Sequence, residues 1–169
     1  MSDITKQSLS ELVKNIKNKK VSSEEITKEF VNRSEKSKEL NAYITEDYSS
    51  ALDKAKKFDQ KPNLDLKLPG IPIAVKDLFC TKDIRTTAGS KILNNFVPTY
   101  ESTVTQNIWN EGAILLGKLN CDEFAMGSSN ETSFFGNVQN PIDKNLVPGG
   151  SSGGSASAVA GQLTPITIG

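Results

Sequence analysis

Apolar side chains recur at helical spacing in the first third of the chain and predict three helices there. Two of the helices begin with capping-box patterns at residues 8–11 and 22–25, where a serine is followed three residues later by a glutamate. The third covers residues 49–58, and residues 41–45 before it favour a short strand. We interpret the apolar stripes of these helices as faces that pack on a core.

The pattern changes after residue 61, because every glycine and proline lies at or after Pro62. Three apolar runs predict buried strands, at residues 70–75, 113–116 and 163–168, the second bounded by Gly117. Two further helices are predicted, one capped by Ser102 and running through residue 111, the other over residues 155–160. Strands that alternate with helices favour an α/β fold. We therefore predict an N-terminal helical segment over residues 1–62 and an α/β core over residues 63–169.

Composition narrows the class of protein. The apolar fraction of 36% and charged fraction of 24% are typical of globular chains, and Lys+Arg balance Asp+Glu at 20 each. No global basic field is available to hold nucleic acid. No apolar stretch approaches the length of a membrane span, and the N-terminus lacks a signal-peptide layout, so we predict a cytoplasmic location. Cys80 and Cys121 are predicted to be free thiols in that compartment.

The chain contains no histidine, which excludes several kinds of site. Ser-His-Asp and Cys-His catalysis are impossible within it, as are histidine metal sites. Two cysteines without CxxC spacing do not form a zinc site either, so no metal is expected. Any nucleophile activated by this chain needs lysine, aspartate or glutamate as its base.

Lys76 is one candidate base. It ends an apolar run in which Ile71, Ile73 and Val75 alternate with small residues. Burial there would favour the neutral amine, which can accept a proton from a hydroxyl. From this run alone, however, a solvent-exposed lysine at a strand end is the commoner arrangement.

A Gly-Ser segment at residues 148–155 is the second candidate. Two glycine pairs flank Ser151 and Ser152, directly before a predicted helix. A phosphate-binding P-loop is disfavoured because no Gly-Lys-Ser/Thr follows. A flexible linker is the alternative, but an apolar strand pattern follows the segment, and linkers do not usually lie inside a core pattern.

Taken together, these segments resemble the amidase signature family. The match runs in order through residues 70–77, 101–104, 116–120, 122–127 and 148–155. It covers about residues 69–169, and the helical N-terminus fits more loosely. The resemblance implies a mixed β-sheet flanked by helices, here incomplete. The block at residues 122–133 is most similar to the glutamine-hydrolysing subunits of tRNA-dependent amidotransferases, which commonly have methionine where this chain has Cys121.

The resemblance also implies roles for individual residues. The family uses a Ser-Ser-Lys triad, in which Lys76 matches the general base and Ser151 the serine that relays the proton. Met126, Gly127 and Ser128 match a turn that lines the substrate pocket, although a plain structural turn is equally expected at such a place.

The family's nucleophilic serine follows the strand that matches residues 163–169, so we expect it to lie beyond Gly169. The chain is then the N-terminal portion of a longer protein, and we predict that it is inactive alone. Strands that lack their partners would expose apolar edges, which predicts poor solubility or self-association.

For the complete enzyme, the resemblance implies hydrolysis of glutamine and transfer of ammonia to partner subunits B and C. These amidate glutamate or aspartate on charged tRNA, and the choice between the two stays open. ATP and Mg are expected at the partner subunit, with no cofactor in this one and no membrane contact. Two alternatives are a non-catalytic or split fragment that acts as an interaction module, and another amidase-family hydrolase.

Overall fold

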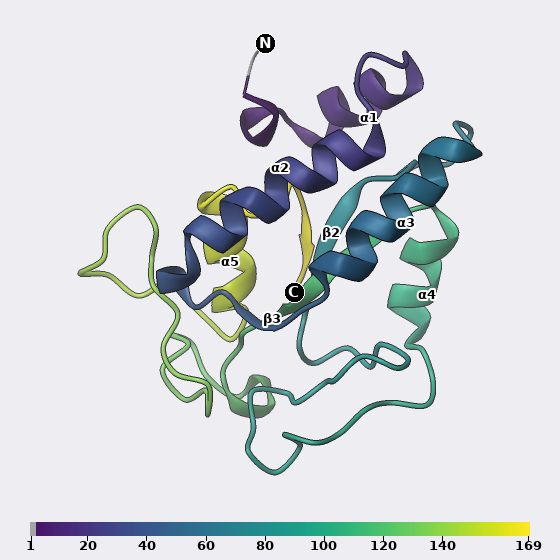
Figure 1. Ribbon diagram of the computed structural model, residues 1–169. Helices are drawn as coiled ribbons and strands as arrows, with labels where there is room; N and C mark the ends of the chain where they lie inside the picture. The colour runs from purple at the N-terminus through teal and green to yellow at the C-terminus, as the bar shows by residue number, and fades with distance from the viewer. Residues whose placement is uncertain (1–2) are drawn as a thin grey trace.

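A four-stranded mixed sheet carries helices on both of its faces in the computed structural model, which describes residues 3–169 (Figure 1). The α-helices are α1 (Leu9–Lys17), α2 (Ser23–Lys36), α3 (Tyr48–Gln60), α4 (Thr103–Asn110) and α5 (Gly153–Ala160). The strands are β1 (Tyr43–Glu46), β2 (Pro72–Lys76), β3 (Ile114–Leu119) and β4 (Thr167–Ile168). Short 3₁₀ turns are η1 (Ile4–Lys6), η2 (Lys38–Leu40) and η3 (Glu123–Ala125). The predicted α/β class with a mixed sheet is confirmed.

The sheet has the order β1-β3-β2-β4. β2 is parallel to both β3 and β4, whereas β1 runs antiparallel to β3. Every residue of β2 and β3 is buried, as expected for parallel strands that are covered on both faces. The division into two segments near residue 62 stays a prediction, and β1 from the first segment pairs with β3 of the second.

Two apolar clusters cover the sheet. The larger joins α1, α2 and α3 to Leu116 of β3 and to Ile71, which directly precedes β2. The smaller places Ala158 of α5 against Ala74 and Leu119. The loops that follow β2 and β3 extend beyond one end of the sheet, at the carboxyl ends of these strands (Figure 1). In open α/β sheets this end is where ligands usually bind.

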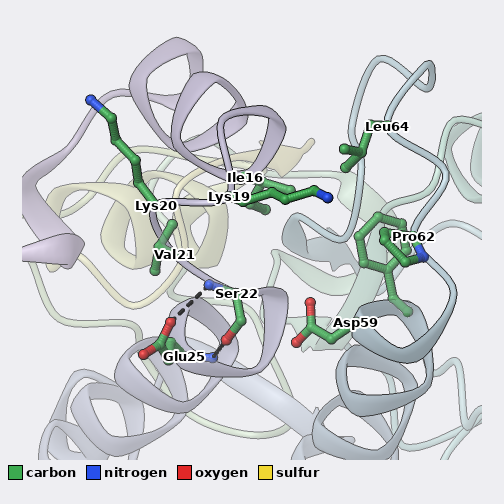
Figure 2. Close-up of a pocket in the computed structure, with 10 residues that line it drawn as sticks. Ile16, Lys19, Lys20, Val21, Ser22, Glu25, Asp59, Pro62 and Leu64 are labelled. Atoms are coloured by element: carbon green, nitrogen blue, oxygen red, sulfur yellow. Dashed lines mark hydrogen bonds between the residues drawn. The ribbon is translucent and has the colours of Figure 1, made fainter.

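Both predicted capping boxes are present. Ser8 accepts a hydrogen bond from the backbone N–H of Glu11 at 3.3 Å, and the Glu11 carboxylate accepts one from the Ser8 N–H at 2.8 Å. Ser22 and Glu25 repeat this exchange at 3.0 Å and 2.8 Å, drawn as dashed lines in Figure 2. These local bonds satisfy backbone donors that a helix start leaves free.

All four predicted strands are observed with shifted bounds, and two of them differ by more than two residues at one end. The strand expected at residues 113–116 continues through Gly117 to Leu119. Gly117 does not end the strand; glycine is needed inside it because β1 lies so close that a Cβ at Gly117 would be less than 3.0 Å from the Thr45 carbonyl oxygen. Only the end of the run at residues 163–168 is a strand. The Leu163 N–H instead donates to the Ala158 carbonyl at the end of α5, which turns the chain before β4 begins.

Cys80 and Cys121 are free thiols, as predicted. Within residues 3–169, none of the helices combines the length and the apolar content that crossing a membrane requires.

Asp59 of α3 gives a test of how the helices hold together. Its carboxylate accepts the backbone N–H groups of Ser23 and Glu24 at 2.9 Å and 2.8 Å, and so caps the start of α2 from a neighbouring helix (Figure 2). Asp59→Ala should lower the free energy of unfolding by about 1 kcal/mol, the usual effect of losing an N-terminal cap. Equilibrium urea unfolding measures this. Asp53→Ala, at an exposed position of the same helix, is the control, and an equal loss there would contradict the capping role.

Candidate active site

Lys76 is the last residue of β2 and is buried, with only 4% of its surface exposed. Its Nζ donates hydrogen bonds to Ser151 Oγ at 2.8 Å and to Ser152 Oγ at 2.9 Å. The expectation of a solvent-exposed lysine was therefore wrong for this position. The hydroxyls that cover Lys76 come from a loop about 75 residues later in the chain, which the apolar run itself could not indicate.

Backbone contact at the start of α5 places the two serines beside Lys76. The register of the parallel strands sets Lys76 opposite Leu119, and Asn120 follows directly. Gly154 donates its N–H to the Asn120 carbonyl at 3.0 Å, and a Cβ at Gly154 would lie less than 3.0 Å from that carbonyl oxygen. Glycine is required there because only a residue without a side chain lets α5 begin against the end of β3.

The other glycines of the segment also face specific neighbours. A Cβ at Gly150 would lie less than 3.0 Å from the Asp122 carboxylate, and one at Gly153 less than 3.0 Å from the Asn130 amide. Gly149 has open space but a φ of +85°, which glycine adopts without strain. The Gly150–Ser151 peptide bond is cis. The loop is thus packed against the fold, which argues against the flexible linker considered above.

The turn predicted to line the substrate pocket lies next to this loop. Met126, Gly127 and Ser128 are exposed, Met126 by 80%. The carbonyl carbon of Ser128 lies so close to Gly150 that a Cβ there would clash with it. The structure therefore brings the turn and the serine loop together, while contact between the turn and a substrate stays a prediction.

A second buried lysine was missed by sequence reasoning. Lys118 of β3 is fully buried and donates to the Phe79 carbonyl at 2.8 Å and to Thr86 Oγ1 at 2.7 Å, with an Asp77 carboxylate oxygen at 3.4 Å. Burial raises the pKa of Asp77 and lowers the pKa of Lys118, and this outweighs their mutual attraction. The available signal was a charge inside an apolar strand, which requires a buried partner.

Asp77 follows Lys76 in the chain, but its carboxylate is directed elsewhere. It accepts hydrogen bonds from the backbone N–H of Thr87 at 2.8 Å and from the Thr87 hydroxyl, and it pairs with Lys118. Lys76 has no carboxylate within 4.0 Å in the part of the chain that the structure describes. The nearest polar partners of Lys76 are hydroxyls, as an amine that exchanges protons with serine requires.

Cys121 is also fully buried, and burial raises the pKa of its thiol to about 12. A thiol with such a pKa is almost entirely protonated at neutral pH, so Cys121 is not a nucleophile. Serine hydroxyls remain the reactive groups next to Lys76.

A pocket of about 500 Å³ lies among α1, α2 and α3, and its lining includes neither Lys76 nor the serines of the loop (Figure 2). Its lining includes Val21 from the α1–α2 turn, Phe58 near the end of α3 and Leu64 from the loop that follows α3. Asp59 points toward the start of α2 in this view and is already used as its cap. The pocket and the site formed by Lys76 and the serine loop are therefore at different places.

Comparison with known proteins agrees with the geometry. The family model described as Amidase matches residues 25–169. The chain is 83% identical over all 169 residues to the A subunit of the glutamyl-tRNA(Gln) amidotransferase from Pelagibacter ubique, and 52% identical over its full length to that from Rickettsia bellii. It spans 35% and 36% of these relatives' lengths. The crystal structure of the same amidotransferase component from Thermotoga maritima superposes with a TM-score of 0.76 at 32% identity, covering 97% of this chain and 34% of that one.

The buried pair of Lys118 and Asp77 generates a stability prediction. Lys118→Met keeps an apolar stem but leaves the Asp77 carboxylate buried without its cation, which should lower the free energy of unfolding by about 3–5 kcal/mol. Urea unfolding of both proteins checks this. The matched control is Lys67→Met, which removes an exposed ion pair with Glu111 at 3.1 Å and should change stability little. Equal effects of the two substitutions would show that burial does not determine the contribution of the pair.

Proposed function

The chain belongs to the amidase family, and we propose that within it Lys76 acts as general base and Ser151 as the relay for hydrolysis of the glutamine side-chain amide. The observation that carries the proposal is the buried hydrogen bond of 2.8 Å between Lys76 Nζ and Ser151 Oγ. Because the chain spans about a third of its curated relatives, the attacking serine is expected from the remainder of such an enzyme.

The two hydroxyls around Lys76 suit a proton relay. A neutral amine can accept the Ser151 proton while it still donates a hydrogen bond to Ser152. The contact with Ser152 then holds the lysine side chain in place while the proton passes between Ser151 and the amine. Ser151 in turn takes the proton of the attacking serine. Serine oxygen then bonds to the amide carbon, and the proton returns through Ser151 to the nitrogen as the C–N bond breaks and ammonia leaves. Water hydrolyses the acyl-enzyme to glutamate and free serine.

The relatives support a proposal for the substrate and the partners. Two relatives, at 83% and 52% identity, are glutamyl-tRNA(Gln) amidotransferase A subunits. We infer that ammonia passes to partner subunits B and C, which amidate the amino acid on charged tRNA with ATP and Mg, in the cytoplasm. Met126, Gly127 and Ser128 would border the glutamine, since they lie on the exposed turn beside the serine loop.

A chimeric enzyme tests the proposal. These 169 residues replace the aligned residues of the Pelagibacter ubique relative, which is co-expressed with its partner subunits. The chimera should release ammonia from glutamine, and Lys76→Ala should lower kcat by about 100- to 10,000-fold, the usual contribution of a general base. Ammonia release from glutamine is the measurement. Lys67→Ala, at an exposed lysine, is the control. Wild-type turnover in the Lys76→Ala enzyme would remove Lys76 from the mechanism.

A further inference from the structure

Asp122 is a fully buried carboxylate that the reaction above does not use. One of its oxygens accepts the backbone N–H of Asn130 at 3.0 Å. The other accepts the Thr132 hydroxyl at 2.9 Å and the Thr132 N–H at 3.3 Å. These bonds close the loop of residues 122–132, which carries the turn of Met126, Gly127 and Ser128.

The same carboxylate contacts two glycines from different loops. A Cβ at Gly127 would lie less than 3.0 Å from three atoms of the Asp122 carboxylate, and a Cβ at Gly150 less than 3.0 Å from one of its oxygens. Neither glycine has a positive φ. Gly127 therefore lacks a side chain because Asp122 fills its space, and Gly150 because Asp122 and the backbone of Ser128 and Ser129 fill its space.

Asp122 also touches the relay serine through its backbone. Its N–H donates to the Ser151 carbonyl oxygen at 3.1 Å, in the same residue whose hydroxyl bonds Lys76. Asn130, held by Asp122, packs its side chain against Gly153 at the start of α5. The loop after β3 thus supports the serine loop at both of its glycine pairs.

The Asp122 group remains a carboxylate near neutral pH. Burial alone would raise its pKa, but the hydrogen bonds from Thr132 and Asn130 outweigh burial and hold the pKa below its ordinary value. An uncharged amide at this position would face the same N–H groups with one acceptor oxygen in place of two.

We propose that Asp122 is the positioning residue that holds the substrate-side turn at residues 126–128 against the relay loop at Ser151, so that substrate and proton relay keep one fixed separation. The inference rests on the proposed function for the roles of turn and relay. In this role Asp122 acts through its bonds to Asn130, Thr132 and the Ser151 backbone.

Asp122→Asn in the chimeric enzyme tests this positioning. Loosening both loops should raise KM and lower kcat together, with a fall in kcat/KM of about 100-fold, as expected for a misplacement of about 1 Å. A merely structural role would lower the amount of folded enzyme and leave KM unchanged. Asp59→Asn is the matched control, because that carboxylate also accepts two backbone N–H groups but lies at the start of α2. Its KM and kcat should equal those of the unsubstituted enzyme.

Two milder substitutions at Thr132 keep the test decisive if the Asp122→Asn enzyme folds poorly. Thr132 is exposed, so Thr132→Val removes its hydroxyl bond to Asp122 with little risk to the core, and Thr132→Ser restores that bond. KM should rise several-fold in the valine enzyme and return toward the starting value in the serine enzyme. Unchanged KM in both Asp122→Asn and Thr132→Val would overturn the proposal.

A double-substitution cycle with Gly127 gives an independent readout. Gly127→Ala should lower kcat/KM strongly on its own, because its Cβ meets the Asp122 carboxylate, and much less when Asp122 is also alanine. If the effects of the two substitutions on kcat/KM simply multiply, the proposed positioning role of Asp122 is contradicted.

Each assay is run with glutamine and with a simple amide side by side. Hydrolysis of the simple amide without hydrolysis of glutamine would reject the proposed substrate, and the Asp122 comparison would still be measured on the simple amide.

Discussion

The contact between the start of α5 and the end of β3 is the constraint on which the candidate site depends. β3 is hydrogen-bonded to β2, so Lys76 has a fixed place relative to Asn120. Gly154 then meets Asn120 backbone to backbone, which fixes the serines just before it. Main-chain atoms have no rotamers, so this contact fixes the backbone of the serine loop relative to the end of β2. The backbone contact brings the two residues within reach, and their side chains then form the hydrogen bond of 2.8 Å between Lys76 Nζ and Ser151 Oγ.

The composition of the glycine-serine loop follows from what surrounds it. Gly150, Gly153 and Gly154 each face a different neighbour, and in each case the neighbour fills the space of a side chain. Gly149 alone of the four needs glycine for its backbone conformation. A sequence of this kind is usually associated with flexibility. Here the same residues make a tightly packed loop, since absent side chains let other groups of the protein come close.

The elements that local sequence determines were predicted well. Both capping boxes, the cap at Ser102 and the apolar strand that ends at Lys76 depend on residues a few positions apart. Predictions were wrong where contact with a distant segment of the chain determines the local structure. Gly117 suggested a strand end, but the approach of β1 makes glycine necessary inside the strand.

In the candidate site, too, the features that depend on short motifs were predicted and those that depend on distant contacts were not. The resemblance of short motifs picked out Lys76 and Ser151, and the structure brings these two together. The burial of Lys76, its second contact with Ser152 and the Lys118–Asp77 pair all require knowledge of which strands are neighbours. No periodicity along the chain contains that information. Asp122 was missed for the same reason, because its two glycine contacts come from one loop nearby and one almost thirty residues later.

The separation of Lys76 from its serine partners in sequence has a consequence for how the protein acquires its chemistry. Closing a loop of about 75 residues is slow and entropically costly, so non-local contacts of this kind form after local helices. During synthesis Lys76 emerges well before the residues that cover it, and it stays in water until α5 docks on β3. Lys76 and its serine partners therefore come together only after the segments around them have been made and packed.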